Sequence, residues 1–248
     1  MKFLFKGYTL LIILVILSIL SLFIGVSQLS ITDLFHLSDN QKNILFSSRI
    51  PRTISILLSG SSLALAGLVM QQMMQNKFVS PTTAGTMEWA KLGILLSLIF
   101  FPKGHILIKL TFAVALSLGG TFLFVKLINF IKVKEVIFVP LLGIMIGGIV
   151  SSFTTFIALR TNALQSINNW LNGNFAVITS GRYEILYLAI PLLIIAYIFA
   201  NHFTIAGMGK DFSHNLGVKY EQIINIALLI TATLTALVVV TVGTLPFL

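Results

Sequence analysis

Two arginines three residues apart carry the first candidate chemistry in this sequence. Arg49 and Arg52 flank Pro51 in the block Arg-Ile-Pro-Arg, at the mouth of an apolar segment that otherwise avoids charge. Proline here suits the first turn of a helix, so we expect a helix to begin at this block. Guanidinium groups pair with carboxylates through two parallel hydrogen bonds, which favours docking of acidic side chains from an outside protein. The simpler interpretation is that both arginines reach lipid headgroups.

Side-chain amides gather at the far end of the same apolar segment. Gln71, Gln72, Gln75 and Asn76 precede Phe78 and Pro81. Amides at membrane depth are usually tolerated where they face protein or a water-filled path. Two interpretations therefore stay open, a polar helix end at the membrane interface or a constriction beside a translocation path.

Glu88 and Lys91 are charges inside another largely apolar segment. Three residues apart, they share one face of a helix and can form an intramembrane ion pair. Pairing shares the cost of a charge at the bilayer centre, about 2.5–3.5 kcal/mol on insertion scales.

The longest polar connections include the segment from His202 to Gln222, which we interpret as two short helical turns broken at glycine. A compact polar loop between apolar segments suits a partner-binding element. Its polar and glycine residues are Gly207, Gly209, Lys210, Asp211, His214, Asn215 and Gly217. His202 and His214 have no metal-ligand spacing, so an interfacial role fits them better than a metal site.

Catalytic arrangements are missing from the sequence. It contains no Cys, no His-Glu-x-x-His and no phosphate-binding loop ending in Gly-Lys-Ser/Thr, which excludes thiolate chemistry and an ATPase in this chain. An intramembrane enzyme needs a His or a pair of acids on facing helices, and we find no such pair. We predict no enzyme, no catalytic residue and no metal.

The composition identifies the bilayer as the solvent of this chain. Of 248 residues, 57% are hydrophobic and 9% are charged, with mean hydropathy +1.02, whereas soluble domains carry about 25% charged residues. The net charge of +9 lies mostly in short connections, which favours anionic lipid headgroups and soluble partner proteins over nucleic acid.

Helices of about 20 apolar residues are needed to cross the hydrocarbon core. The sequence predicts one all-α, polytopic membrane domain over residues 1–248, and its basic, apolar start is a retained first helix. The seven predicted spans are Tyr8–Ser27, Ile54–Met74, Thr86–Phe101, Ile106–Phe130, Val136–Leu159, Ile185–Asn201 and Ile223–Leu245.

The block from Arg49 to Gly85 resembles the permease subunits of ABC importers for iron–siderophore complexes, haem and cobalamin, the FecCD-type, BtuC-like family. There an Arg-x-Pro-Arg opens the second membrane helix, followed by Gly, Ala-x-(Ser or Ala)-Gly, Gln, Asn and Pro. The matching residues are Arg49, Pro51, Arg52, Gly60, Ala64, Ala66, Gly67, Gln71, Asn76 and Pro81. Further matches are the loop from Gly209 to Leu216-Gly217, Trp170-Leu171-x-Gly173, and the run from Val242 to Phe247.

This resemblance implies a BtuC-like bundle with seven of an expected ten membrane helices, in a chain truncated at its C-terminus. Arg49 and Arg52 would dock the outer binding protein. The path and cytoplasmic gate would be lined by Gln71, Asn76, Phe78, Gly143 and Gly147. A loop would transmit closure of the ATPase, through Gly209, Lys210, Asp211, His214, Leu216 and Gly217. Two permease subunits, identical or related, would pair with two ATPases, and ATP would be bound by the ATPases with no cofactor on this chain.

Two departures from the family pattern mark a subgroup with its own substrate. The chain has Asn76-Lys77-Phe78 where the family has Asn-Pro-Leu, and Glu88 and Lys91 where the family is neutral. The expected function is uptake of iron(III)–siderophore complexes across the bacterial plasma membrane, and haem or cobalamin are the alternative substrates. From other classes, a non-transport assembly or channel subunit and an intramembrane enzyme stay open.

Overall fold

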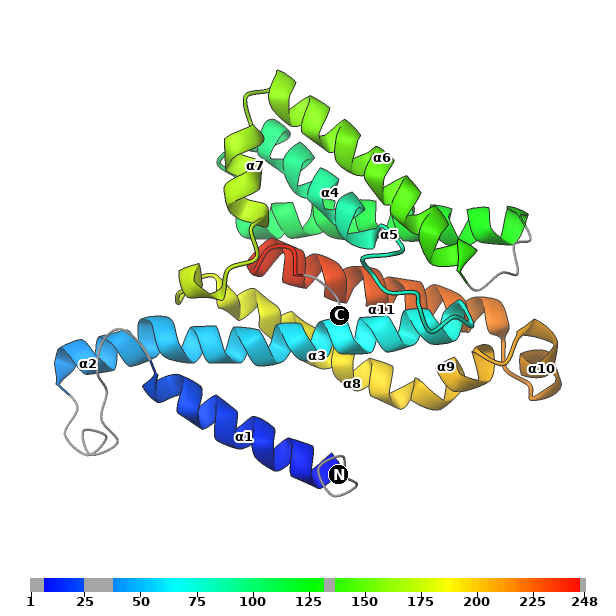
Figure 1. Cartoon of the computed structure of the whole chain (residues 1–248), viewed down its shortest axis with the longest axis horizontal. Coiled ribbons are helices and arrows are strands. Elements are labelled where there is room, and N and C mark those ends of the chain that lie inside the picture. The colour runs from blue at the N-terminus through cyan, green and yellow to red at the C-terminus, as the bar shows by residue number, and fades with distance from the viewer. Residues whose placement is uncertain (1–6, 25–37, 132–136, 246–248) are drawn as a thin grey trace. The chain divides into compact units, whose positions relative to one another are not determined.

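Helices make up the regular structure of this chain in the computed structural model, which describes residues 7–24, 38–131 and 137–245. An isolated parallel bridge joins Asn172 to Thr244. The all-α fold class is therefore confirmed for the described residues (Figure 1). In chain order the elements are α1 Gly7–Phe23, α2 Asp39–Ile44, the π-helix η2 Leu45–Arg49, α3 Ile50–Met73, α4 Thr86–Phe100, α5 Ile106–Ile131, α6 Phe138–Arg160, α7 Leu164–Leu171, the 3₁₀ turns η3 Phe175–Val177 and η4 Tyr183–Leu188, α8 Ala189–Ile198, α9 Ala200–Ala206, α10 Lys210–Asn215 and α11 Tyr220–Thr241.

Four helical stretches in the described residues are long and apolar enough to cross a membrane. They are Asp39–Met73, Ile106–Ile131, Phe138–Arg160 and Tyr220–Thr241. A fifth span forms if η4–α8 and α9 count together, although they are bent by 58°. Helices α1 and α4, with 17 and 15 residues, are shorter than the usual span of about 20. The count of seven spans therefore stays a prediction.

The α-helix α3 begins at Ile50, within the arginine block as expected, but it continues a longer helical stretch. The helical stretch begins at Asp39, where Ser38 and Gln41 form a capping box, and it continues to Met73. Pro51 lies inside it, directly after the π-helix η2. A π-helix bonds five residues back rather than four, so this irregular turn accommodates a residue that has no N–H to donate.

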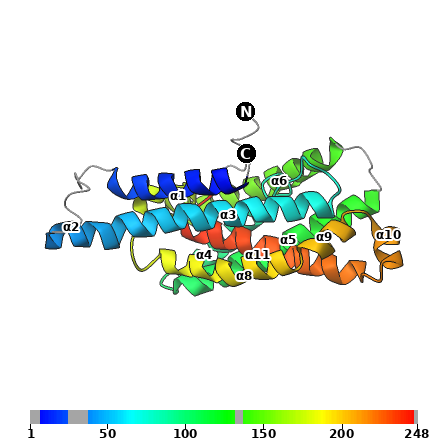
Figure 2. The ribbon, with the colours of Figure 1, turned by 90° about the horizontal axis from the view of Figure 1, so that it is seen from below.

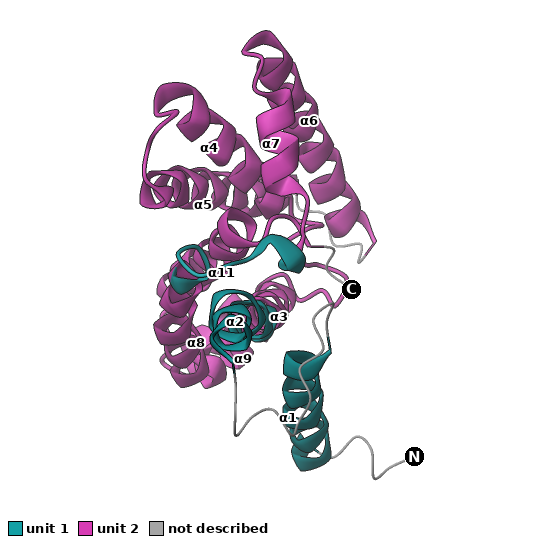
Figure 3. Ribbon diagram, turned by 90° about the vertical axis from the view of Figure 1, so that its left-hand side faces the viewer, with its two compact units in different colours: residues 1–57, 175–184 teal, residues 58–174, 185–248 magenta. Residues whose placement is uncertain are grey.

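The described chain divides into two compact units, shown in different colours in Figure 3. Unit 1 comprises residues 1–57 and 175–184, and unit 2 comprises residues 58–174 and 185–248. The assignment of residues 1–248 to one permease domain stays a prediction.

Helix α11 forms the centre of unit 2. Beyond its polar first turns it is apolar or threonine on all sides. It contacts α4, α5, α8 and α9, and Figures 1 and 2 show it running beside α5 and α8. A helix that is hydrophobic all round belongs in a core. Its Leu228, Leu234 and Leu237 share one buried cluster with Val69 of α3 and Phe203 of α9.

Glycines allow α4 and α5 to approach closely, as membrane helices do where small residues meet. A Cβ at Gly93 would lie 2.5 Å from the Phe112 carbonyl oxygen, and one at Gly120 would collide with the Trp89 ring. The close pairing fixes the start of α4, and with it the charged pair at Glu88 and Lys91.

Candidate functional site

Arg49 ends the π-helix η2 and is largely buried, with 8% of its surface exposed. Its Nη1 donates a hydrogen bond of 2.6 Å to the carbonyl oxygen of Leu22, in the last turn of α1. Carbonyl groups at a helix C-terminus lack intrahelical donors and carry partial negative charge. Arg49 therefore caps α1.

Arg52 differs from Arg49 in being exposed. Within the described residues its side chain makes no hydrogen bond or ion pair. Of the two arginines predicted to dock an outside protein, Arg52 is thus the one that presents its guanidinium to solvent. The sequence could not separate the two, because both are arginines beside the same proline and exposure is set by the fold. The docking role itself stays a prediction.

The segment 175–184 is held against η2 by a bond that follows from Pro51. In an α-helix the Ser47 carbonyl would accept from residue 51, but proline has no N–H. Instead the Ser180 N–H donates to Ser47 O at 3.1 Å. Arg182 lies in the same segment, and its burial lowers the pKa of its guanidinium from the ordinary value. The side chain nevertheless stays charged at neutral pH.

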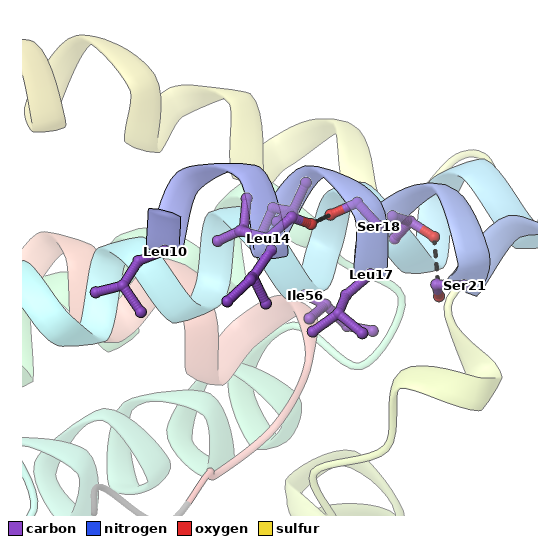
Figure 4. A pocket seen from close by; sticks show the side chains of 9 residues that line it. Leu10, Leu14, Leu17, Ser18, Ser21 and Ile56 are labelled. Atoms are coloured by element: carbon purple, nitrogen blue, oxygen red, sulfur yellow. Dashed lines mark hydrogen bonds between the residues drawn. The ribbon is translucent and has the colours of Figure 1, made fainter. Parts of the chain in front are cut away.

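An apolar pocket of about 410 Å³ lies between α1 and the first turns of α3 in unit 1. Figure 4 shows Leu10, Leu14 and Leu17 of α1 and Ile56 of α3 among the side chains that line it. The Ser21 and Thr53 hydroxyl oxygens are 3.4 Å apart at its edge. No charged residue lines it, so it suits hydrocarbon and not a polar ligand.

The predicted gate residues form a tight turn after α3. The Asn76 N–H donates to Gln71 O at 3.0 Å, and buried Asn76 accepts the Phe78 N–H on Oδ1 at 2.9 Å. Gln75 has a positive φ of 49°, which the turn requires. Phe78 projects outward with 66% of its surface exposed. Asn76 thus shapes the turn that presents Phe78.

The predicted path glycines of α6 pack on the turn before α4. A Cβ at Gly143 would collide with the Thr83 carbonyl oxygen, and the Cα of Gly147 lies 3.4 Å from a Cβ built at Gly85. Gly85 has a φ of 75° and caps the N-terminus of α4. Neighbouring Gly148 is exposed, with nothing within 4 Å of its Cβ position. A path-lining role for Gly143 and Gly147 stays a prediction.

Glu88 and Lys91 form an ion pair in the first half of α4. Lys91 Nζ lies 2.6 Å from Glu88 Oε1, and about a fifth of each side chain is exposed. The other carboxylate oxygen, Oε2, is buried without a hydrogen-bond partner in the described residues. A Cβ at Gly147 would contact Glu88 Cγ at 3.5 Å, so the structure brings this pair beside a predicted path residue.

The predicted partner-binding loop folds around α10. Gly209 and Gly217 bracket the helix with positive φ values of 108° and 72°, which glycine adopts without strain. Buried Ser213 anchors it, with Oγ 3.1 Å from Ile205 O and 2.7 Å from Gly209 O. Lys210 Nζ lies 3.0 Å from Glu221 Oε1 of α11. The loop residues Asp211, His214, Leu216 and Gly217 are exposed.

An apolar stripe on this loop was missed by the sequence analysis. Met208, Phe212 and Leu216 expose 59%, 49% and 54% of their surfaces. Phe212 lies on α10 and Leu216 is its C-cap, four residues apart as neighbours on one helical face are, and Met208 lies just before the helix. That spacing was the signal available in the sequence. Exposed apolar side chains rimmed by polar ones mark protein contacts.

Two sequence motifs far apart in the chain meet at the end of α11. Trp170 Nε1 donates to Val240 O at 3.0 Å, and the Thr244 N–H donates to Leu171 O at 3.0 Å. Gly243, with a φ of 99°, allows the close approach. Lys109 Nζ of α5 lies 4.7 Å from the Trp170 ring centre, a cation–π distance. The sequence analysis quoted both motifs but did not predict this contact.

Metal-ligating side chains do not cluster in the part of the chain that the structure describes, where no group of three or more His, Cys, Asp or Glu residues could hold an ion.

Comparisons with known proteins place this arrangement among membrane permeases. Residues 12–248 match the model of the FecCD transport family. The chain is 54% identical to the petrobactin import system permease protein YclN of Bacillus subtilis, covering 96% of this chain and 75% of that protein. It is 37% identical to the petrobactin permease FatD of Bacillus anthracis, covering 96% and 69%. It is 34% identical to the ferric-anguibactin permease FatD of Vibrio anguillarum, covering 92% and 72%.

A solved structure shares the fold. It is an inward-facing ABC transporter assigned to the metal-chelate type, which superimposes with a TM-score of 0.75 and covers 96% of this chain and 76% of that one. At 23% sequence identity, this likeness concerns the fold alone.

Proposed function

This chain belongs to the FecCD transport family, and we propose that it is the permease subunit of an ABC importer for iron(III)–siderophore complexes. The observation that carries this proposal is the 54% identity to a petrobactin permease over nearly the whole chain. The chain is a non-enzymatic, multi-pass subunit of the bacterial plasma membrane, and ABC importer permeases in general work with ATPase and substrate-binding subunits.

The first chelate to test is ferric petrobactin. The two most similar relatives named above carry that chelate in their names, and the third is named for another siderophore, anguibactin. Haem and cobalamin are the alternative cargoes. The charges at Glu88 and Lys91 support a subgroup with its own substrate, because charged side chains in a membrane are retained for function by default.

Different parts of the chain are proposed to contact different partners. Exposed Arg52 is the proposed contact for carboxylates of an outer binding protein. Asn76 and Phe78 are the proposed gate, and the exposed stripe of Met208, Phe212 and Leu216 is the proposed contact for the ATPase. A second permease subunit would complete the path.

ATP binding by the partner would drive transport by favouring one of two conformations. A ligand shifts such an equilibrium only by its differential affinity for the two states. Helix α10 is joined to α11 by the Lys210–Glu221 ion pair, so a movement of the ATPase against α10 would be passed to α11, the centre of unit 2.

Uptake of radiolabelled iron tests the proposal. Cells lacking the complete gene, and complemented cells, are offered iron on petrobactin, on a hydroxamate, on citrate and as haem. We expect loss of uptake from petrobactin alone, restored by complementation. Unchanged uptake of every siderophore, with haem uptake lost instead, would contradict the siderophore assignment.

A further inference from the structure

A second pocket of unit 2 lies where α3 ends, α5 ends and α11 begins, and it has no role in the proposed transport path. Its volume is about 440 Å³. Helices α5 and α11 are long and apolar enough to be membrane spans, and from this we infer that their ends, and this pocket, lie near the membrane–water interface. Figures 1 and 2 show the start of α11 beside α10.

Five residues that line this interface pocket carry hydrogen-bond donors. Lys126, Asn129, Asn225 and Gln75 are exposed, and Tyr220 is partly buried. None of these five side chains makes a hydrogen bond within the described residues. Lys126 also has no acidic partner there. A ligand with several acceptor oxygens and a negative charge would satisfy them together.

The acid in the pocket lining does not oppose an anion strongly. Glu221 is the one carboxylate that lines it in the described chain, and its Oε1 lies 3.0 Å from Lys210 Nζ. Lys126 and Glu221 are the charged residues of the lining, and with Lys210 beside Glu221 the charges at the pocket come to +1.

Apolar residues from the same helices make up much of the rest of the lining. They include Met73 and Met74 of the α3 end, Phe122 and Val125 of α5, and Leu228 of α11. A free inorganic anion would gain nothing from these residues, whereas the glycerol and acyl region of a lipid would be buried against them. The lining therefore matches one amphipathic molecule.

We propose that this pocket is a binding site for an anionic phospholipid. The phosphate would accept hydrogen bonds from Lys126 and from the amides of Asn129 and Asn225. The glycerol and the start of the acyl chains would lie on Phe122 and Leu228.

Lipid in this pocket would also affect how the ATPase is coupled to the permease, a consequence that rests on the proposed function. Glu221 lines the pocket and holds Lys210 of α10. Gln75 lines it too, and its Nε2 lies 3.4 Å from the position of a Cβ on Gly209. A bound headgroup would therefore stabilise the loop proposed to contact the ATPase.

Lipid retention by the complete purified importer tests the binding site without any substrate. The importer is equilibrated with mixed phosphatidylglycerol and phosphatidylcholine, washed in detergent, and examined for bound lipid by native mass spectrometry. Wild type should retain phosphatidylglycerol selectively, and K126Q should bind it about fivefold more weakly, because one basic residue at a membrane surface contributes about that factor. K126R should retain it.

The matched control removes a lysine at the other end of α5. Lys103 is exposed and precedes that helix, so K103Q should leave retention unchanged. Equal retention by K126Q and wild type would overturn the proposal. So would displacement of the lipid by inorganic phosphate at millimolar concentration, which would identify a free-anion site. Iron uptake by wild-type cells is measured separately, so a failure of the lipid site is distinguishable from a failure of the transport function.

Discussion

Identical residue types have different surroundings in the arginine block. Arg49 uses its guanidinium to cap α1, whereas Arg52 faces solvent. We therefore predict that Arg52→Glu weakens binding of the outer binding protein at least tenfold, since like charges facing each other across an interface are strongly unfavourable. Membrane insertion should be normal. Binding of the purified binding protein to the importer measures the effect.

The control for this prediction is Lys42→Glu on α2, an exposed cation of the same unit. It should bind as wild type does. Wild-type docking and uptake with Arg52→Glu would remove the docking role from this residue.

Arg49 should matter for stability instead. Arg49→Met leaves the Leu22 carbonyl without this donor, and an unsatisfied buried group costs about 1–3 kcal/mol. We expect a lower thermal midpoint in detergent, with Arg49→Lys in between because it retains a donor. A wild-type midpoint with lost docking would show that Arg49 acts on the partner and not on α1.

At the scale of the element, α10 separates an anchored face from an exposed one. Ser213 is buried and bonded to the chain, and Phe212 and Leu216 are exposed. Phe212→Asp should therefore abolish co-purification of the ATPase while folded yield is unchanged, because a charge would replace an apolar contact. Asn215→Asp, exposed on the same helix, is the control. Retained ATPase with Phe212→Asp would place the contact elsewhere.

Helix α6 offers a paired test of its packing. Gly143→Val would drive a side chain into the Thr83 carbonyl, and overpacking typically costs about 1–3 kcal/mol. Its thermal midpoint and folded yield should fall. Gly148→Ala meets open space and should leave both unchanged. Equal midpoints for the two variants would contradict the described contact.

At the scale of the whole molecule, apolar runs predicted where helices occur, because a segment in lipid must hydrogen-bond its backbone groups within itself, as a helix does. The start of α2 was missed, since Asp39 is far from the apolar run and only the Ser38–Gln41 capping box marks it. Contacts distant in sequence, such as the hydrogen bond from Trp170 to Val240, could not be predicted. The acceptor is a backbone carbonyl, which every residue carries, so the sequence does not mark the partner. Residue type was enough to single out the candidate site residues in the sequence. Only the structure shows that Arg49 is buried and Arg52 is exposed.

The most direct measurement is transport by the complete importer in proteoliposomes. Vesicles that enclose ATP, with the ATPase facing inward, receive from outside a binding protein loaded with radiolabelled ferric petrobactin. We predict ATP-dependent accumulation of iron inside, absent with a non-hydrolysable ATP analogue. Vesicles that hydrolyse ATP but accumulate no iron above that control would contradict the assignment of this chain as a siderophore permease.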